Sequence, residues 1–541
     1  MRIKNMIFSM LIGNRVYEIL IDDFEDITVK ENINNLNEVS TILPEIFLGI
    51  SLVFLVLHGI LLCSSKEKNF PLIQMSIIKL GILILLFTFF LVCNNIILIE
   101  SSFYNNTIVF DNLSISSKQC IIIASIICLL IMQQYLNDQK INSFEYILLI
   151  LFAVFGLLLI CSSNDLITAY LAIEVQSLSF YLLAAYKKDS VFSTESGLKY
   201  FILGAFSSSM FLFGSSLIYG TTGTTNFEDL KDLFFYAYPG NFFFNGFDGI
   251  SQTFEINLLQ FGLLFLIISL FFKLALAPFH IWSPDIYEGS LTSSTFFFAV
   301  IPKLGLFVLL TRFFQYSFYG FIDNYRYCIV AIAIFSIIIG SFTGLEQRKI
   351  KSLLAYSSIG HMGYSLLAFS SCTFEGLQAL FCYLIVYIIA GLCTWSIFLS
   401  LKLKNKYIKK GNKDLSDFAL LVKSNNTLTL FFSTVLLSLA GFPPLIGFYA
   451  KMNVFLVAIE TSMYFAAIVG ILCSVISTFY YIRIIKTLYF EKSLTGKLYY
   501  PISYQNSLII GICFFLFIFL FLNPNVLYLF SYKMSLIGYF L

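Results

Sequence analysis

Six charged side chains lie inside stretches of the chain that are otherwise apolar for about 20 residues. They are five lysines and one glutamate: Lys79, Lys199, Lys273, Lys303, Lys451 and Glu174. A charge at mid-bilayer depth costs from about 3 to more than about 10 kcal/mol, so such residues are usually kept for a function. Carboxylates and lysines that exchange protons in a low-dielectric interior suit the movement of ions across a membrane.

The composition indicates a membrane protein. Of the 541 residues, 58% are hydrophobic and only 12% are charged, whereas soluble domains contain about 25% charged residues. Each apolar run is long enough to cross the ~30 Å hydrocarbon core as a helix. The runs are continuous, which argues against a β-barrel with its shorter alternating segments. A large soluble helical bundle is the less favoured alternative. We therefore predict an all-α integral membrane protein.

About fourteen transmembrane helices are expected. The apolar runs lie near residues 41–63, 72–97, 119–136, 143–161, 164–186, 196–219, 257–280, 291–316, 326–344, 350–371, 376–401, 427–459, 461–490 and 505–530. Connecting segments after the odd spans carry nineteen Lys and Arg residues, and those after the even spans carry four, namely Lys118, Lys231, Arg312 and Arg326. The positive-inside rule then places the odd segments in the matrix or cytoplasm and both termini on the opposite side.

The chain divides into five parts. Residues 1–40 are expected to form an extramembrane extension, without the pattern of a cleavable signal peptide, and residues 41–142 to form three helices. Two repeats should follow at 143–316 and 326–490, and a last transmembrane helix at 491–541. The repeat rests on Ala169, Tyr170, Ile173 and Ser179, which match Ala355, Tyr356, Ile359 and Ser365 at one offset. An odd number of spans separates the copies, which predicts inverted repeats of the kind found in transporters.

Glu174 is the one acid at a clear mid-membrane position, in the middle of the span at 164–186. Lys199, one to two turns into the next span, is a plausible partner. The pair could handle protons, because a nearby cation changes how readily a buried carboxyl ionises. The alternative is a static ion pair that fixes two helices.

Two other lysines stand beside proline breaks. Pro278 cannot donate its backbone hydrogen bond, so the helix that carries Lys273 must break or kink, and its freed carbonyls then require protein or water. Pro443 and Pro444 interrupt the span that carries Lys451 in the same way. Desolvation favours the neutral form of a lysine, and a lysine that can lose its proton can relay it. Snorkelling to the inner interface is the competing interpretation for Lys273.

Further polar residues could link these sites. Lys303 directly follows a proline midway along its span, and His280 lies in the segment broken by Pro278. His361 shares a polar face with neighbouring serines and a tyrosine, although a hydrogen-bonded core histidine remains an alternative. Together with Glu174, Lys199, Lys273 and Lys451, these residues could form a hydrated chain across the bundle. Lys79 and His58 are better explained as peripheral.

The sequence carries no motif for a cofactor of its own. The eleven cysteines are scattered without C-x-x-C spacing, the three histidines are not paired as haem ligands, and no phosphate-binding or dinucleotide motif is present. We therefore expect neither a metal site nor a bound cofactor in this chain, and nothing in it favours a nucleic-acid partner. The energy for transport must then come from another subunit.

Several motifs resemble one family. They are NDL at 164–166, AIEVQSLS at 172–179, GLKY at 197–200, APFHIWSPDIYEG at 277–289, LLAYSSIGHMGY at 353–364, and GFPPLIGF at 441–448 followed by Lys451. In this order they resemble the family of NADH dehydrogenase subunit 2, an antiporter-like membrane subunit of respiratory complex I. The resemblance covers roughly residues 41–530. Heavy use of Phe, Tyr, Ile, Asn and Lys is typical of an AT-rich organelle genome and suggests the mitochondrial type.

The resemblance implies a role for each buried charge. Glu174 and Lys199 would be the input pair, Lys273 and Lys303 the central relay, and Lys451 the exit residue, in a fold of two inverted five-helix repeats with two broken helices. NADH, flavin, iron–sulfur clusters and ubiquinone would belong to other subunits. The expected partners are other membrane-arm subunits, including neighbouring antiporter-like ones, and phospholipids such as cardiolipin. The expected location is the mitochondrial inner membrane, with the termini in the intermembrane space.

Two other functions stay open at the level of sequence. A subunit of a multisubunit sodium/proton antiporter would use the same acid and lysines without NADH chemistry. A structural scaffold would hold the same charges as static pairs. Copurification with NADH-oxidising subunits separates the first alternative, and pumping by a Lys273→Met complex separates the second.

Overall fold

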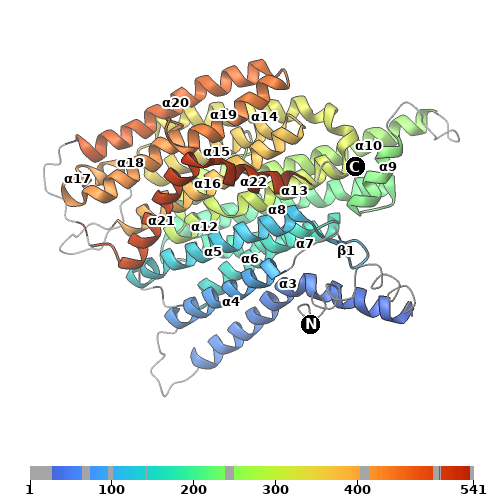
Figure 1. The fold of residues 1–541 in the computed structure, drawn as a ribbon, viewed down its shortest axis with the longest axis horizontal. Helices are drawn as coiled ribbons and strands as arrows, with labels where there is room; N and C mark the ends of the chain where they lie inside the picture. The colour runs from blue at the N-terminus through green and yellow to red at the C-terminus, as the bar shows by residue number, and fades with distance from the viewer. Residues whose placement is uncertain are drawn as a thin grey trace, which may run out of the picture.

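A computed structural model describes residues 27–63, 74–94, 101–139, 141, 143–237, 249–401, 414–491, 499 and 501–536. The chain forms a bundle of roughly aligned helices, as Figure 1 shows. The first half contains α3 (Ile27–Cys63), α4 (Gln74–Asn94), β1 (Ser101–Phe103), β2 (Ile108–Phe110), α5 (Asn112–Asp138), α6 (Glu145–Ser162), α7 (Leu166–Ala184), α8 (Val191–Thr222), α9 (Phe227–Ala237), α10 (Gly249–Lys273), α11 (Trp282–Gly289), α12 (Thr292–Val300) and α13 (Pro302–Thr311).

The second half begins with a π-helix, η2 (Arg312–Ser317), that directly continues α13. It is followed by η3 (Tyr319–Phe321), α14 (Ile322–Glu346), α15 (Ile350–Phe369), α16 (Phe374–Ser400), η4 (Leu415–Phe418), α17 (Leu421–Ser424), α18 (Asn426–Ala440), α19 (Ile446–Glu460), α20 (Tyr464–Tyr489), α21 (Tyr504–Leu522) and α22 (Pro524–Ser535).

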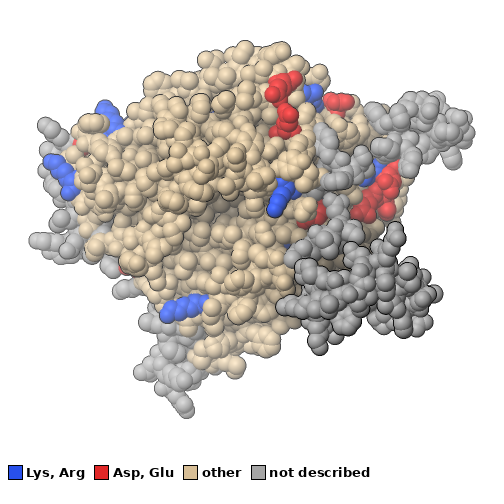
Figure 2. All heavy atoms as spheres, viewed as in Figure 1, with Lys and Arg blue, Asp and Glu red and all other residues tan. Residues whose placement is uncertain are grey.

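The helical membrane fold predicted from the sequence is confirmed. In the described residues, eleven helices are long and apolar enough to cross a membrane. The remaining predicted spans overlap α10, α15, and the pair α18 and α19. Apolar side chains are exposed along the outer faces of α3, α4, α8 and α20, where lipid would cover them. Charged side chains are sparse on the face of the molecule that Figure 2 shows.

The inner helices hold the candidate site. Every residue is buried in the 18-residue apolar stretch of Thr292–Ser317, and 89% of the residues are buried in the corresponding stretch of α16. By contrast, only 28% of the residues in the corresponding stretch of α3 and 33% of those in α4 are buried. These two helices lie along one edge of the bundle in Figure 1. Because a charge placed on α13 or α16 meets protein on every side, its partners must be other side chains, carbonyls or water.

Three local features add to the sequence-based expectation or differ from it. Residues 27–40 are helical and continuous with the first span, and residues 1–26 lie outside the described ranges. Residues 101–110 form an antiparallel hairpin, in which Ser101 pairs with Phe110, within an otherwise helical fold. The last predicted span is two helices, because Pro524 starts α22 directly after α21 ends.

Two helices are interrupted at the level of the buried lysines. The helix α10 ends at Lys273, and a non-helical segment that contains Pro278 leads to α11. The helix α18 ends at Ala440, and Gly441, Pro443 and Pro444 separate it from α19. Proline supplies no backbone donor and its ring clashes with the carbonyl four residues earlier, which favours an interruption at both segments.

Candidate proton-transfer site

Lys273 ends α10 in contact with α7. Its Nζ donates to the hydroxyl of Tyr181 at 3.3 Å and lies 5.7 Å from the centre of that ring. It also interacts electrostatically with the carboxylate of Glu174. Gly204 of α8 makes this arrangement possible, because a Cβ at that position would lie 2.0 Å from the Tyr181 hydroxyl oxygen.

Glu174, Ser177 and Tyr181 lie on one face of α7, since residues three and seven positions apart fall on the same side of a helix. The Ser177 hydroxyl donates to Glu174 Oε2 at 3.4 Å and also interacts with the Tyr181 hydroxyl. Glu174 Oε1 is buried and has no hydrogen-bond partner within the described residues. Polar groups therefore run along α7 from the glutamate to Lys273.

Lys199 is placed differently from the sequence-based expectation. Its side chain is 44% exposed and pairs with Glu195 at 2.9 Å and with Asp285 of α11 at 3.1 Å. The structure therefore places Lys199 with two surface acids, whereas the negative charge of Glu174 acts on Lys273 at longer range than an ion pair. Exposed pairs of this kind contribute little to stability, because water screens both charges.

Lys303 occupies the first turn of α13 and is only 6% exposed. Its Nζ donates to the hydroxyl of Tyr387 at 2.9 Å, and that hydroxyl donates to the carbonyl of Ala299 at 3.0 Å. Pro302 fits the first position of α13, where the backbone N–H would have no acceptor. The turn between α12 and α13 thus aims Lys303 at α16.

His361 lies on α15 between two tyrosine hydroxyls. Its Nδ1 is 2.6 Å from the Tyr383 hydroxyl, and its Nε2 is 3.1 Å from the Tyr481 hydroxyl. A neutral imidazole has one donor and one acceptor nitrogen, so each ring nitrogen can be satisfied by one hydroxyl. The histidine therefore connects α16 to α20 through groups that can both give and accept a proton.

Lys451 reaches back across the second helix break. Its Nζ donates to the carbonyl of Ala440 at 2.8 Å, and that carbonyl belongs to the last residue of α18. The interruption leaves such carbonyls without helical partners, and an ammonium group is a strong donor for them. A cavity of about 20 Å³ lies beside Lys451, with His361 and Tyr387 also on its wall.

Gly441 should not accept a larger residue. Its φ of 91° is in the left-handed region, and a Cβ there would lie 2.9 Å from Cδ of Lys451. We expect Gly441→Ala to cost about 1–2 kcal/mol from backbone strain and to displace the Lys451 side chain. The abundance of the chain in membranes and its melting temperature would both fall. The exposed Gly220, whose Cβ would meet nothing within 4 Å, is the matched control: Gly220→Ala should leave both unchanged.

The remaining predicted residues are more peripheral. His280 lies in the broken segment before α11, with its ring 6.5 Å from that of Tyr356, and its Nδ1 has no partner within the described residues. Lys79 on α4 and His58 on α3 are exposed. In the described part of the chain, no group of three or more His, Cys, Asp or Glu side chains could hold a metal ion.

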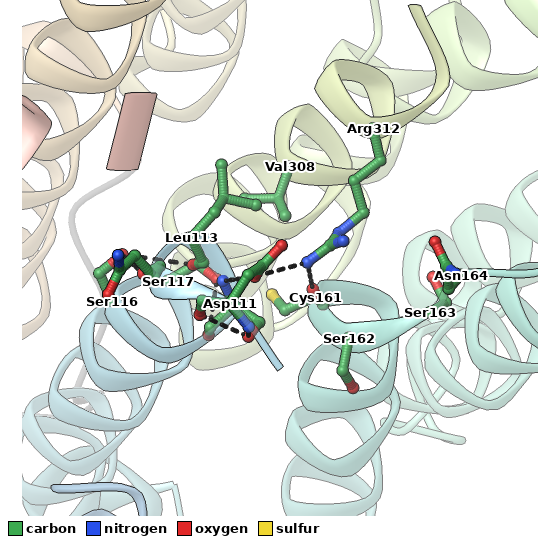
Figure 3. Close-up of polar contacts among 12 residues, drawn as sticks. Asp111, Leu113, Ser116, Ser117, Cys161, Ser162, Ser163, Asn164, Val308 and Arg312 are labelled. Atoms are coloured by element: carbon green, nitrogen blue, oxygen red, sulfur yellow. Dashed lines mark hydrogen bonds and ion pairs between the residues drawn. The ribbon is translucent and has the colours of Figure 1, made fainter. Parts of the chain in front are cut away.

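Two buried ion pairs were missed from the sequence. Lys118 pairs with Glu45, and Arg312 Nη2 pairs with Asp111 at 2.8 Å and also donates to the carbonyl of Cys161 at 3.1 Å. Figure 3 shows Arg312 reaching from its helix toward Asp111 and Cys161. The sequence-based interpretation placed Lys118 in a connecting segment and Arg312 at a helix end. In the structure Lys118 is inside α5 and 1% exposed.

The tyrosine partners were also missed, although one signal was available. Tyr181 follows Glu174 by seven residues and Ser177 follows it by three, which places all three on one helical face. No comparable signal marks Tyr383, Tyr387 and Tyr481. Their separation in sequence from His361 and Lys303 does not indicate that the side chains are in contact. They became identifiable only through the packing of α16 and α20 against α15 and α13.

Interrupted helices in a membrane bundle, each bringing a buried lysine to hydroxyl or carbonyl partners, define the antiporter-like class of transport proteins. Residues 163–477 match the family described as NADH:quinone oxidoreductase/Mrp antiporter, TM. NADH-ubiquinone oxidoreductase chain 2 of Marchantia polymorpha is 39% identical over 493 residues, which is 91% of this chain and 97% of that protein. NADH-quinone oxidoreductase subunit N of Pelagibacter ubique is 39% identical over 84% of this chain and 91% of its own. The chain therefore belongs to the NADH:quinone oxidoreductase/Mrp antiporter family, as its motifs suggested.

Solved structures show the same fold. A chain of respiratory complex I from Thermus thermophilus superposes with a TM-score of 0.71 at 25% identity, covering 90% of this chain and 98% of that one. A chain of the Mrp complex from Dietzia sp. gives a TM-score of 0.75 at 18% identity, covering 93% and 98%. The second similarity is one of fold alone.

Proposed function

We propose that this chain is a proton-translocating membrane-arm subunit of NADH:ubiquinone oxidoreductase, the respiratory complex I. The observation that carries the proposal is the series of buried cationic or titratable groups, each in contact with a hydroxyl or a carbonyl: Lys273 with Tyr181, Lys303 with Tyr387, His361 with two tyrosines, and Lys451 with Ala440. Hydroxyls both donate and accept, so such a series can pass protons without moving the helices far.

Glu174 would control the first step. The negative charge of Glu174 would favour the ammonium form of Lys273 from one helix away. If the glutamate were neutralised or drawn away, Lys273 would release its proton more easily toward the centre of the bundle. The electron-transfer reaction in other subunits would supply this change, and Lys199 with its surface acids would sit outside the main route.

The names of the relatives, which describe NADH oxidoreductase chains, support a proposal for the wider setting. We place the protein in the mitochondrial inner membrane with its basic connecting segments in the matrix and both termini in the intermembrane space. Neighbouring antiporter-like subunits and anionic phospholipids such as cardiolipin would surround it. NADH, flavin, iron–sulfur clusters and ubiquinone would bind to other subunits.

The test uses Glu174→Gln in the intact complex. The amide keeps the shape of the side chain but removes the charge that favours protonated Lys273. We expect the assembled complex to pump protons several-fold more slowly per NADH oxidised, measured with a pH-sensitive dye in sealed vesicles. Glu195→Gln, which alters an exposed acid beside Lys199, is the control and should pump normally. Normal pumping by Glu174→Gln would remove Glu174 from the mechanism.

Copurification distinguishes the two kinds of complex that the family name covers, NADH:quinone oxidoreductase and the Mrp antiporter. A chain that purifies with NADH-oxidising subunits supports the proposal, whereas a chain that purifies in a complex without flavin or iron–sulfur clusters supports a sodium/proton antiporter. Sequence identity favours the NADH:quinone oxidoreductase, because the NADH oxidoreductase relatives are 39% identical to this chain and the Mrp chain is 18% identical.

A further inference from the structure

A cleft lies at the end of the bundle where α16 ends and where α18 and α21 begin. Its volume is about 450 Å³, within the range of about 300–1,000 Å³ that is typical of small-molecule sites. The start of α18 and the start of α21 lie at the same end of the bundle in Figure 1. Because membrane helices begin and end near the membrane surface, the cleft lies at the level of the lipid headgroups.

The wall of the cleft is amphipathic. Its buried lining is apolar and includes Leu421, Leu428 and Ile510. Its exposed lining includes the polar side chains of Ser424, Asn425 and Thr427. An apolar interior with a polar mouth suits a ligand that has a hydrocarbon tail and a hydrated head.

The cleft opens beside a surface that faces lipid. On α21, Leu508, Ile512 and Phe515 are 45%, 52% and 64% exposed, and their spacing places them on one stripe of the helix. Ser507 and Ile510 of the same helix line the cleft. A hydrocarbon chain therefore reaches the cleft from the bilayer without crossing water.

The charge at this end of the bundle favours an anion. Lys423 is exposed in the last turn of α17, next to the mouth of the cleft. Asn425 caps α18 by accepting from the backbone N–H of Leu428 at 3.1 Å, so the positive end of the helix dipole lies at the mouth. The sequence of the connecting segments 402–413 and 492–498 contains eight lysines and no acid. Basic segments beside a membrane attract anionic lipids.

We propose that this cleft binds one anionic glycerophospholipid. An acyl chain would lie against Leu428 and Ile510, and the phosphate would lie at the start of α18 near Lys423. A zwitterionic lipid has the same chains, but the positive charge of its headgroup would meet the positive charge of the protein. The proposal rests on the membrane setting of the proposed function and not on proton transfer.

The experiment labels the intact complex with photoreactive lipids. The complex is placed in nanodiscs of phosphatidylcholine with a minor fraction of phosphatidylglycerol. A diazirine on the acyl chain is carried by one lipid or by the other, and labelled residues are identified by mass spectrometry. We expect phosphatidylglycerol to label Leu428 at least about fivefold more than phosphatidylcholine does, at equal amounts of probe, the effect of one lysine near an anionic headgroup.

Three variants test the position of the lipid. Ser507→Trp places an indole in the cleft, and labelling of Leu428 should fall by at least about fivefold because the ring occupies the space of the chain. The matched control is Leu508→Trp, which puts the same ring on the lipid-facing stripe of α21 and should leave that labelling unchanged. Lys423→Gln should lower the preference for phosphatidylglycerol by about fivefold.

Four results would overturn the proposal. They are the absence of label on Leu428, equal labelling by the two lipids, equal labelling in the two tryptophan variants, and equally strong labelling by a photoreactive fatty acid. The first would mean that another subunit covers the cleft, and the last would assign it to a free fatty acid. If Ser507→Trp does not assemble, the wild type and Lys423→Gln decide. These measurements do not involve pumping, so this inference and the proposed function can fail separately.

Discussion

A complex that carries Lys273→Met is expected to assemble normally and to pump protons at least about tenfold more slowly than the wild type per NADH oxidised. Positioned proton-transfer groups typically contribute factors of about 100 to 10,000, so tenfold is a conservative figure for one member of a series. Methionine keeps the length and the apolar stem of lysine but has no proton to relay. The Tyr181 hydroxyl and the Glu174 carboxylate would both lose their cation.

The control for this prediction is Lys79→Met. Lys79 is exposed on α4, so the same chemical change there should leave pumping within about twofold of the wild type. NADH oxidation by detergent-solubilised complex is measured in parallel, because a lost subunit would lower both rates together. If assembled Lys273→Met pumps as well as Lys79→Met, the lysine is a static structural charge and the relay proposed here is wrong.

The sequence predicted the membrane class and the lysines beside the two helix breaks because both depend on local information. A lysine in an apolar run is visible in the chain itself, and Pro278 and Pro443 reveal where helices stop. The family could be identified for the same reason, since its motifs are short and contiguous. None of this required knowing how the helices pack.

Partner choice could not be predicted, because it depends on helix packing. Lys199 follows Glu174 closely in sequence, and the sequence-based interpretation paired them. The structure instead places Lys199 beside Asp285, 86 residues away, and Lys273 beside the hydroxyl of Tyr181. The tight approach of α8 to α7 at Gly204 decides which side chains meet, and a lone glycine gives no indication of what packs on it.

Arg312 is the second site at which a substitution should have a large effect, here on stability. Arg312 and Asp111 are each 3% exposed, and their ion pair joins the start of η2 to the start of α5. Removing one partner of a buried pair costs about 3–5 kcal/mol, because it leaves the other charge buried without compensation. We expect Arg312→Met to lower the melting temperature of the purified complex and the abundance of this chain in membranes.

A double substitution should recover most of that loss. Asp111→Asn removes the charge that Arg312→Met leaves behind, and asparagine can still cap α5 by accepting from the backbone N–H of Ser114, as Asp111 does at 2.8 Å. The remaining cost should be about 1 kcal/mol, because the carbonyl of Cys161 loses the hydrogen bond from Arg312. The double variant should therefore melt closer to the wild type than Arg312→Met does.

An exposed pair supplies the comparison that makes this result specific to burial. Lys349 and Glu288 form an ion pair whose side chains are 51% and 39% exposed, so Lys349→Met should cost no more than about 1 kcal/mol. If Arg312→Met is no less stable than Lys349→Met, the Asp111–Arg312 pair does not hold α5 to η2. If the double variant is as unstable as Arg312→Met, the loss comes from the shape of the arginine and not from its charge.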